Sequence, residues 1–159
     1  MAIKQKTIVP IKIEADCPTH SRSDISVRDV STTIDEPIER GGTNLGLSPT
    51  ETLVASLVGC TAVIGRKCAA KLEIDVGHLA ISAVCQFDRR GVLLMEEIDM
   101  PFTHVQLNIE TSGTATPAQL TRLGAEVAKF CPVSKLFRQA GVQVEDNWMS
   151  KSETPESSA

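Results

Sequence analysis

Two cysteines, Cys60 and Cys131, are the residues of this chain best suited to redox chemistry. Cys60 lies within an apolar helical stretch, residues 48–62, and Cys131 opens the segment Cys131-Pro-Val-Ser at the start of a helix. A sheltered thiol and a thiol that begins a helix can serve as an attacking thiolate and its resolving partner. Because the two lie far apart in the sequence, only the tertiary fold can bring their Cα atoms within the roughly 7 Å that a disulfide requires.

The nucleophile in such chemistry is the thiolate, and the two positions favour it differently. Apolar surroundings disfavour a thiolate, so we expect Cys60 to need a nearby cation. A helix N-terminus stabilises an anion, which favours the thiolate of Cys131. Each position also has an inert interpretation, with Cys60 as a buried core thiol and Cys131 as a small residue at a helix break.

The remaining Cys and His residues indicate neither a disulfide framework nor a metal site. The chain has five cysteines, with no Cys-x-x-Cys spacing, and three scattered histidines. Structural disulfides and zinc sites normally show paired spacings. We therefore expect no metal and no bound cofactor, and we interpret the other cysteines as core or surface thiols: Cys17, Cys68 and Cys85.

Length and composition favour one cytoplasmic domain. The 159 residues suit a single core, and 42% of them are hydrophobic. With 3% aromatic residues and a net charge of −4, nucleic acid is not an expected partner. The uncharged apolar run Thr52–Gly65 is shorter than the roughly 20 residues that span a bilayer. The first residues show no signal peptide, so we expect no membrane partner.

The N-terminal part of the chain predicts two strands that pair as a hairpin. Residues Thr7–Ala15 alternate apolar and polar side chains, and Pro10 places this strand at a sheet edge. Residues Ile25–Ile34 alternate in part and are expected to pair with it. The following segment, Asp35–Leu47, is predicted to be a loop.

The clearest helix is predicted from Pro49 to about Lys71. Ser48 as N-cap, Pro49 at the first helical position and Glu51 three residues after the cap form a capping box. The helix is apolar on most of its circumference and therefore needs cover on every side. We predict that a second subunit supplies part of that cover.

The rest of the chain predicts three strands and two helices, in this order: strand 74–88, strand 104–111, a helix that begins at Thr116, a shorter helix 132–141 and strand 142–145. The order of elements predicts an α+β class with a mostly antiparallel sheet. We expect a single domain over residues 1–148. The polar, Ser-rich residues 149–159 are expected to be a disordered tail.

Several segments of the chain form a recognisable set of motifs. They are Asp35-Glu-Pro, the segment Gly41-Gly-Thr-Asn-Leu-Gly-Leu-Ser-Pro-Thr-Glu51, Val58-Gly-Cys60-Thr-Ala, Cys131-Pro-Val-Ser and the near-terminal Trp148. Together they resemble the OsmC/Ohr family, and its OsmC-like branch in particular. The resemblance covers residues 35–148. It implies an OsmC-like fold with mostly antiparallel sheets, a long central helix and an intertwined homodimer whose reactive cysteines lie at the subunit interface.

The resemblance also implies an activity: thiol-dependent reduction of organic hydroperoxides. It makes Cys60 the peroxidatic thiol and Cys131 the resolving thiol. An external dithiol, a lipoyl group in some members of the family, supplies the reducing power.

Members of the family use an arginine on an N-terminal strand, held by a glutamate, to activate the thiol. Arg28 is the best-placed candidate here, with Arg22 and Arg40 as alternatives. Glu51 is the candidate glutamate, although the hydroperoxide-resistance branch has its glutamate one position earlier, where this chain has Thr50. The capping role of Glu51 is slightly favoured.

Three hypotheses remain open. The first is a peroxidase that passes through a Cys60 sulfenic acid and a Cys60–Cys131 disulfide. The second is a non-enzymatic thiol redox sensor or a small-ligand-binding homodimer. The third is a structural homodimer with inert thiols.

Overall fold

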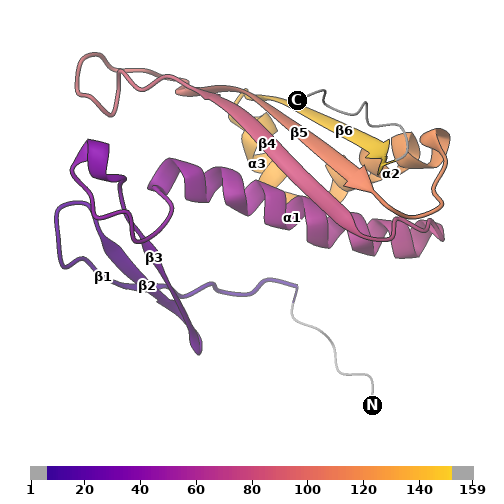
Figure 1. The fold of residues 1–159 in the computed structure, drawn as a ribbon, viewed down its shortest axis with the longest axis horizontal. Helices are drawn as coiled ribbons and strands as arrows, with labels where there is room; N and C mark the ends of the chain where they lie inside the picture. Colours follow the sequence, from indigo (N-terminus) through magenta and orange to yellow (C-terminus); the bar gives the residue numbers. More distant parts are fainter. Residues whose placement is uncertain (1–6, 152–159) are drawn as a thin grey trace. The chain divides into compact units, whose positions relative to one another are not determined.

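The structure is a computed structural model that describes residues 7–151. Its elements, drawn in Figure 1, are β1 (Glu14–Asp16), β2 (Ser23–Val27), β3 (Val30–Ile34), the 3-10 helix η1 (Ile38–Arg40), α1 (Pro49–Leu72), β4 (Leu79–Phe87), β5 (Phe102–Thr111), α2 (Pro117–Phe130), α3 (Pro132–Gln139) and β6 (Gln143–Ser150). The predicted α+β class is confirmed. The chain divides into two compact units, Met1–Leu53 and Val54–Ala159.

The first unit contains an antiparallel three-stranded sheet in the order β1-β2-β3. The predicted strand Thr7–Ala15 is wrong over most of its length, because the strand begins only at Glu14. The apolar side chains of Ile11 and Ile13 are exposed. Alternation defines an apolar face, but a strand also needs a neighbouring backbone that satisfies its hydrogen bonds.

The segment predicted as one strand, Ile25–Ile34, is itself a hairpin. Strands β2 and β3 pair from Ser23↔Ile34 to Val27↔Val30 around a turn at Arg28-Asp29. Arg28 adopts the left-handed conformation, with φ +58°. Such turns are usually signalled by Asn or Gly. Because an arginine stands here instead, the sequence pattern does not indicate the turn.

Helix α1 has the bounds that its cap chemistry predicts. The Ser48 amide donates to Glu51 Oε2 at 2.8 Å, and the Glu51 amide donates to Ser48 Oγ at 3.4 Å, which completes the capping box. By length and composition, the whole of α1 is long and apolar enough to cross a membrane. The uncharged run within it, Thr52–Gly65, is too short to do so. Core helices of soluble proteins meet the same criterion.

The second unit contains a mixed sheet in the order β4-β5-β6. Strands β4 and β5 are antiparallel, whereas β5 and β6 are parallel. A parallel pair needs a long crossover, and α2 with α3 provides it. Strand β6 continues through Met149 and Ser150, so the predicted tail cannot begin at residue 149. The rest of that tail, residues 152–159, lies outside the described residues.

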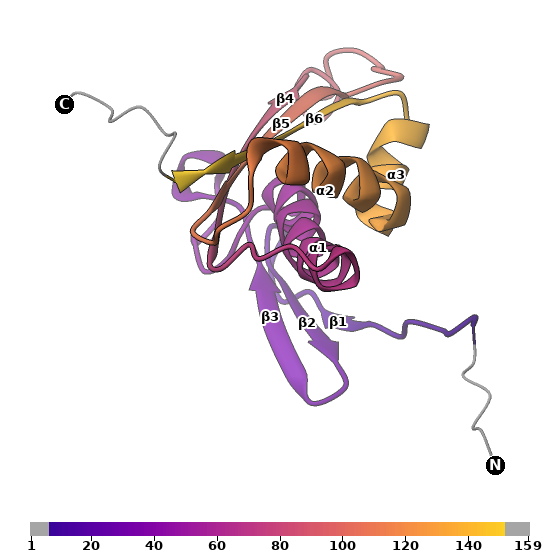
Figure 2. The ribbon, with the colours of Figure 1, turned by 90° about the vertical axis from the view of Figure 1, so that its right-hand side faces the viewer.

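The three helices cover one face of the β4-β5-β6 sheet, as Figure 2 shows. The core lies between this face and the helices. Its fully or almost fully buried side chains come from α1, β5 and α2: Leu57, Val105, Leu107, Ile109, Leu120, Leu123 and Val127. Helix α2 begins at a second capping box, formed by Thr116 and Gln119, as predicted. Helix α3 begins directly after it, because Pro132 cannot donate the hydrogen bond that would continue α2.

Trp148 of β6 packs closely against α1 and α2 at two glycines. A Cβ atom added to Gly65 would lie 2.7 Å from Trp148 Cη2, and one added to Gly124 would lie 2.9 Å from Trp148 Cδ1. Neither distance is compatible with a side chain. These glycines therefore let both helices approach the indole ring, and this contact fixes α1, which carries Cys60, against β6.

Candidate active site

The fold of the second unit brings Cys60 and Cys131 together. Cys60 lies on α1 and Cys131 lies at the junction of α2 and α3. Their sulfur atoms are 3.0 Å apart, with the Cys131 thiol donating a hydrogen bond to Cys60 Sγ. Both cysteines are free thiols. At this distance a disulfide can form with only a small displacement, since S–S bonds measure about 2.05 Å.

The two thiols differ in access to solvent, in the opposite sense to the sequence-based expectation. We expected Cys60 to be the sheltered thiol, but it is partly exposed, whereas Cys131 is completely buried. The neighbours Leu57 and Thr61 lie on the buried side of α1 and leave Cys60 at the edge of the core. Cys60 is therefore the more exposed residue of the pair.

Cys131 is the N-cap of α3, as predicted. Its sulfur accepts a hydrogen bond from the Ser134 amide at 3.4 Å. The cap favours a thiolate, but burial disfavours the charge more strongly. Burial, together with the hydrogen bond to Cys60, raises the pKa of Cys131 from 9.0 to about 11. Cys131 therefore keeps its proton near neutral pH, which agrees with its role as hydrogen-bond donor to Cys60.

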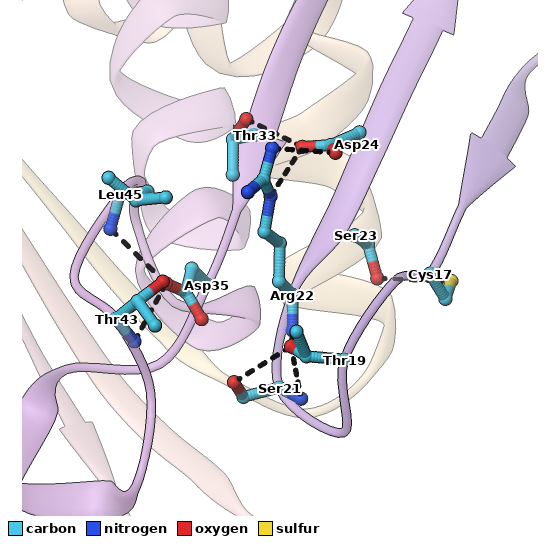
Figure 3. A network of polar contacts seen from close by, with 10 residues as sticks. All are labelled: Cys17, Thr19, Ser21, Arg22, Ser23, Asp24, Thr33, Asp35, Thr43 and Leu45. Carbon is cyan, nitrogen blue, oxygen red and sulfur yellow. Dashed lines mark hydrogen bonds and ion pairs between the residues drawn. The ribbon is translucent and has the colours of Figure 1, made fainter.

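Arg28 and its alternative Arg22 belong to the first unit. Arg28 lies in the turn between β2 and β3. Figure 3 shows that Arg22 is held by a carboxylate: its Nε donates to Asp24 Oδ1 at 2.9 Å, and Thr33 Oγ1 donates to the same oxygen at 2.8 Å. The hydrogen bond from Arg22 lowers the pKa of Asp24. Of the two arginines, Arg22 thus has the arrangement in which a carboxylate orients a guanidinium.

The same figure shows a buried carboxylate that shapes the loop before α1. Asp35 is fully buried, and its Oδ2 accepts hydrogen bonds from Thr43 Oγ1 at 2.6 Å, from the Thr43 amide at 3.0 Å and from the Leu45 amide at 3.2 Å. The bond from the Thr43 hydroxyl is the main cause that lowers the pKa of Asp35. The Asp35 side chain therefore closes the loop that leads to Ser48.

Glu51 is committed to the helix cap. Its carboxylate accepts the Ser48 amide, and this bond is the main cause that lowers the pKa of Glu51. The charge of Arg40 lowers it further. The structure thus supports the capping role, and a role of Glu51 or Arg28 toward Cys60 stays a prediction.

The other cysteines do not form a second thiol pair in the described part of the chain. Cys17 is exposed and lies 3.4 Å from Ser23 Oγ, Cys68 is buried, and Cys85 is partly exposed on β4. Burial raises the pKa of Cys68 and of Cys85. Within residues 7–151 there is also no cluster of His, Cys, Asp and Glu side chains that could hold a metal ion.

Three residues around Cys131 were not identified from the sequence. Ser134 contributes the amide that reaches the sulfur, and Arg138 contacts both Ser134 Oγ and Asp146. The position of Ser134, three residues after an N-cap, is a usable signal, because that amide usually bonds the cap side chain. The pairing of Arg138 with Asp146 joins a helix to a strand and has no local sequence signature.

Solved structures share this fold at low sequence identity. An OsmC-like protein from Mycoplasma pneumoniae has a TM-score of 0.75 at 14% identity, over 89% of this chain and 97% of that chain. The organic hydroperoxide resistance protein OsmC from Legionella pneumophila has a TM-score of 0.68 at 18% identity, over 90% and 98%. OhrB of Bacillus subtilis, an organic hydroperoxide resistance protein, has a TM-score of 0.62 at 20% identity, over 89% and 98%.

The family assignment rests on the sequence as well as on the fold. A search of the curated proteins finds no match. The sequence profile described as OsmC-like protein, however, matches residues 42–146, which is more than half of the chain and includes both Cys60 and Cys131. This chain therefore belongs to the OsmC/Ohr family.

Proposed function

We propose that this protein is a cysteine-based peroxidase that reduces organic hydroperoxides to alcohols. The observation that carries the proposal is the 3.0 Å separation of the sulfur atoms of a partly exposed cysteine, Cys60, and a fully buried one, Cys131. A peroxidase of this kind needs one sulfur that reacts with the hydroperoxide. It also needs a second sulfur that can form a disulfide with the first but is itself shielded from the hydroperoxide.

In the first step the Cys60 thiolate attacks the terminal oxygen of the hydroperoxide. An S–O bond forms, the O–O bond breaks, and the alkoxide takes a proton from water and leaves as the alcohol. Cys60 is oxidised by two electrons to a sulfenic acid. The hydrogen bond from the Cys131 thiol to Cys60 Sγ supports this order of events, because a thiolate is the better acceptor of the two forms.

In the second step Cys131 attacks the sulfenic sulfur. The S–S bond forms, the S–O bond breaks, and the hydroxyl leaves as water with the proton of the Cys131 thiol. An external dithiol then reduces the disulfide by thiol–disulfide exchange, so that both cysteines regain their protons and the dithiol becomes a disulfide. A dihydrolipoyl group is a reductant of this class.

The preference for organic hydroperoxides is supported by the apolar surface of α1 beside Cys60. Val63, three residues after Cys60 and so slightly less than one helical turn away, is 54% exposed. Where the second copy proposed below leaves part of this face open beside Cys60, an alkyl or aryl group gains free energy on it, whereas hydrogen peroxide does not. Solved structures with the same fold carry the name organic hydroperoxide resistance protein.

In our proposal an arginine supplies the cation that activates Cys60. Arg28 is the candidate from the sequence, and Arg22, held by Asp24, has the better support. The carboxylate of Glu51 is already engaged by Ser48. In our proposal Glu51 therefore acts on the site by fixing the start of α1.

We further propose that the working form is a cytoplasmic homodimer. Only 28% of the most apolar part of α1 is buried within the chain, although this helix is apolar on most of its circumference. A second copy would cover the exposed face. Nothing in the reaction requires nucleic acid or a membrane.

The proposal is tested by steady-state reduction of cumene hydroperoxide with excess dihydrolipoamide. We expect turnover in the wild type, none in Cys60→Ser, and loss of the intramolecular disulfide in Cys131→Ser. Cys85→Ser is the matched control, because Cys85 is also a partly exposed thiol, and it should turn over normally. Stoichiometric oxidation of Cys60 without turnover would instead favour a redox sensor.

A further inference from the structure

A series of polar contacts connects Cys131 to β6. The Ser134 amide donates to Cys131 Sγ at 3.4 Å. Arg138 Nε donates to Ser134 Oγ at 3.4 Å, and Arg138 Nη2 lies 3.2 Å from Asp146 Oδ2. The path therefore runs from the sulfur through the first turn of α3 to its last turn and then to the sheet.

Arg138 contacts both of the largely buried side chains in this series, Ser134 and Asp146. Ser134 is 2% exposed, and the Asp146 side chain is 11% exposed, whereas the Arg138 side chain is 40% exposed. Asp146 lies on the same face of β6 as Val144 and Trp148, which is the face toward the helices. Burial raises the pKa of Asp146, and the charge of Arg138 opposes that effect. Arg138 is thus the cationic partner of a largely buried carboxylate and offsets part of the cost of its burial.

Helix α3 needs such an anchor because it is short. It has eight residues, so its own backbone hydrogen bonds are few and its ends are prone to fray. The Ser134 amide can reach Cys131 Sγ only while the first turn is formed. A side chain that fastens both Ser134 and the sheet holds that turn in place.

We propose that Arg138 is a positioning residue for Cys131: by joining Ser134 Oγ to Asp146 it keeps the Ser134 amide directed at the sulfur that closes the disulfide. The proposal rests on the resolving role of Cys131 given above. Cys131 is buried and holds its proton, so the attack needs a donor that stabilises negative charge on its sulfur as the proton leaves. The Ser134 amide is placed to supply that stabilisation. Among the described residues, the titratable groups in direct contact with this series are Cys60 of α1, at Cys131, and Asp146 of β6, at Arg138.

The test uses diamide in place of a peroxide, so that it does not depend on peroxidase activity. The Cys60 thiolate adds to the N=N bond of diamide, and Cys131 then displaces the adduct. The disulfide forms, and diamide takes up two electrons and two protons to become a hydrazine. Quenched mass spectrometry measures the addition and the ring closure separately, as a function of pH.

We expect Arg138→Ala to slow ring closure about tenfold and to move the midpoint of its pH dependence upward, while addition at Cys60 changes less than about twofold. Lys135→Ala removes an equal charge from the exposed side of the same helix. This variant should form the disulfide at the wild-type rate. Arg138→Lys keeps the charge but cannot contact Ser134 and Asp146 together, so it should be intermediate. If Arg138→Ala does not fold, Ser134→Ala removes only the hydroxyl that Arg138 contacts and should show a smaller effect of the same sign.

Unchanged closure and pH midpoint in Arg138→Ala would overturn the proposal, as would equal slowing by Lys135→Ala. Failure of the wild type to close the disulfide with diamide would also overturn it. If Arg138→Ala closes the disulfide slowly with diamide while the wild type shows no turnover with cumene hydroperoxide, the peroxidase function is rejected and the positioning role of Arg138 is supported.

Discussion

At the residue scale, Cys60 and Cys131 differ in how deeply each residue is buried and in the groups around its sulfur. Cys60 is partly exposed at the edge of the core, and Cys131 is buried beneath it at the start of α3. Helix capping and burial act on the pKa of Cys131 in opposite directions, and burial prevails, because the backbone amides at the start of α3 offset only part of the cost of a buried charge. The neutral form of the buried Cys131 thiol is therefore favoured near neutral pH.

The raised pKa of Cys131 predicts how stability depends on pH. The folded chain holds this proton up to about pH 11, whereas the unfolded chain releases it near 9.0. The folded state thus binds more protons in this window, and the free energy of unfolding should fall as pH rises through it. Urea unfolding of the reduced protein should show a steeper decline in the wild type than in Cys131→Ser. Cys68 and Cys85 are present in both proteins, so equal slopes would contradict the assignment.

Glu51 can be tested by separating its capping function from a role toward an arginine. Glutamine also completes a capping box, so Glu51→Gln should retain most of the stability and the peroxide turnover. Glu51→Ala should lose about 1 kcal/mol of unfolding free energy. Urea denaturation and the turnover assay together provide the measurement. A stable Glu51→Gln protein without turnover would show that the charge of Glu51 acts in the reaction.

At the element scale, the helices were predictable because their start signals are local. Ser48 with Glu51 and Thr116 with Gln119 set the starts of α1 and α2, and Cys131-Pro132 sets the start of α3. Each signal depends on residues within one turn of the helix.

The strands were less predictable because their hydrogen bonds depend on distant partners. The alternating residues before Glu14 form no strand in the described chain, and the turn at Arg28 has no glycine or asparagine to mark it. The same limit applies to the site. Cys60 and Cys131 stand in recognisable motifs, but the contact of Arg138 with Asp146 exists only after α3 packs on β6.

The packing of Trp148 between two glycines gives a prediction for α1. Gly65→Ala should gain up to about 1 kcal/mol from helix propensity but lose more through the clash with the indole ring, for a net loss of about 1–2 kcal/mol. The loss should shrink in a Trp148→Phe background, because phenylalanine lacks the Cη2 atom that the new methyl group meets. A double-mutant cycle from thermal or urea unfolding measures this coupling. Additive effects would contradict the contact.

At the scale of the whole molecule, the incomplete burial of α1 is the main feature that one chain does not explain. A homodimer would cover its exposed apolar face. We expect sedimentation velocity to show a dimer and Val63→Glu, at a position that is 54% exposed on α1, to weaken it at least tenfold. Val84→Glu is the matched control, because Val84 is 63% exposed on the face of β4 that points away from the helices. A monomeric wild type, or equal weakening by both variants, would contradict the dimer.

Peptide mapping after a single equivalent of cumene hydroperoxide tests whether Cys60 receives the oxidant and Cys131 closes the disulfide. We predict one intramolecular Cys60–Cys131 disulfide, with Cys17, Cys68 and Cys85 still alkylatable after unfolding. In Cys131→Ser the same treatment should leave a sulfenic acid on Cys60 that dimedone traps. Oxidation found first at the exposed Cys17, or no oxidation at Cys60, would contradict the claim.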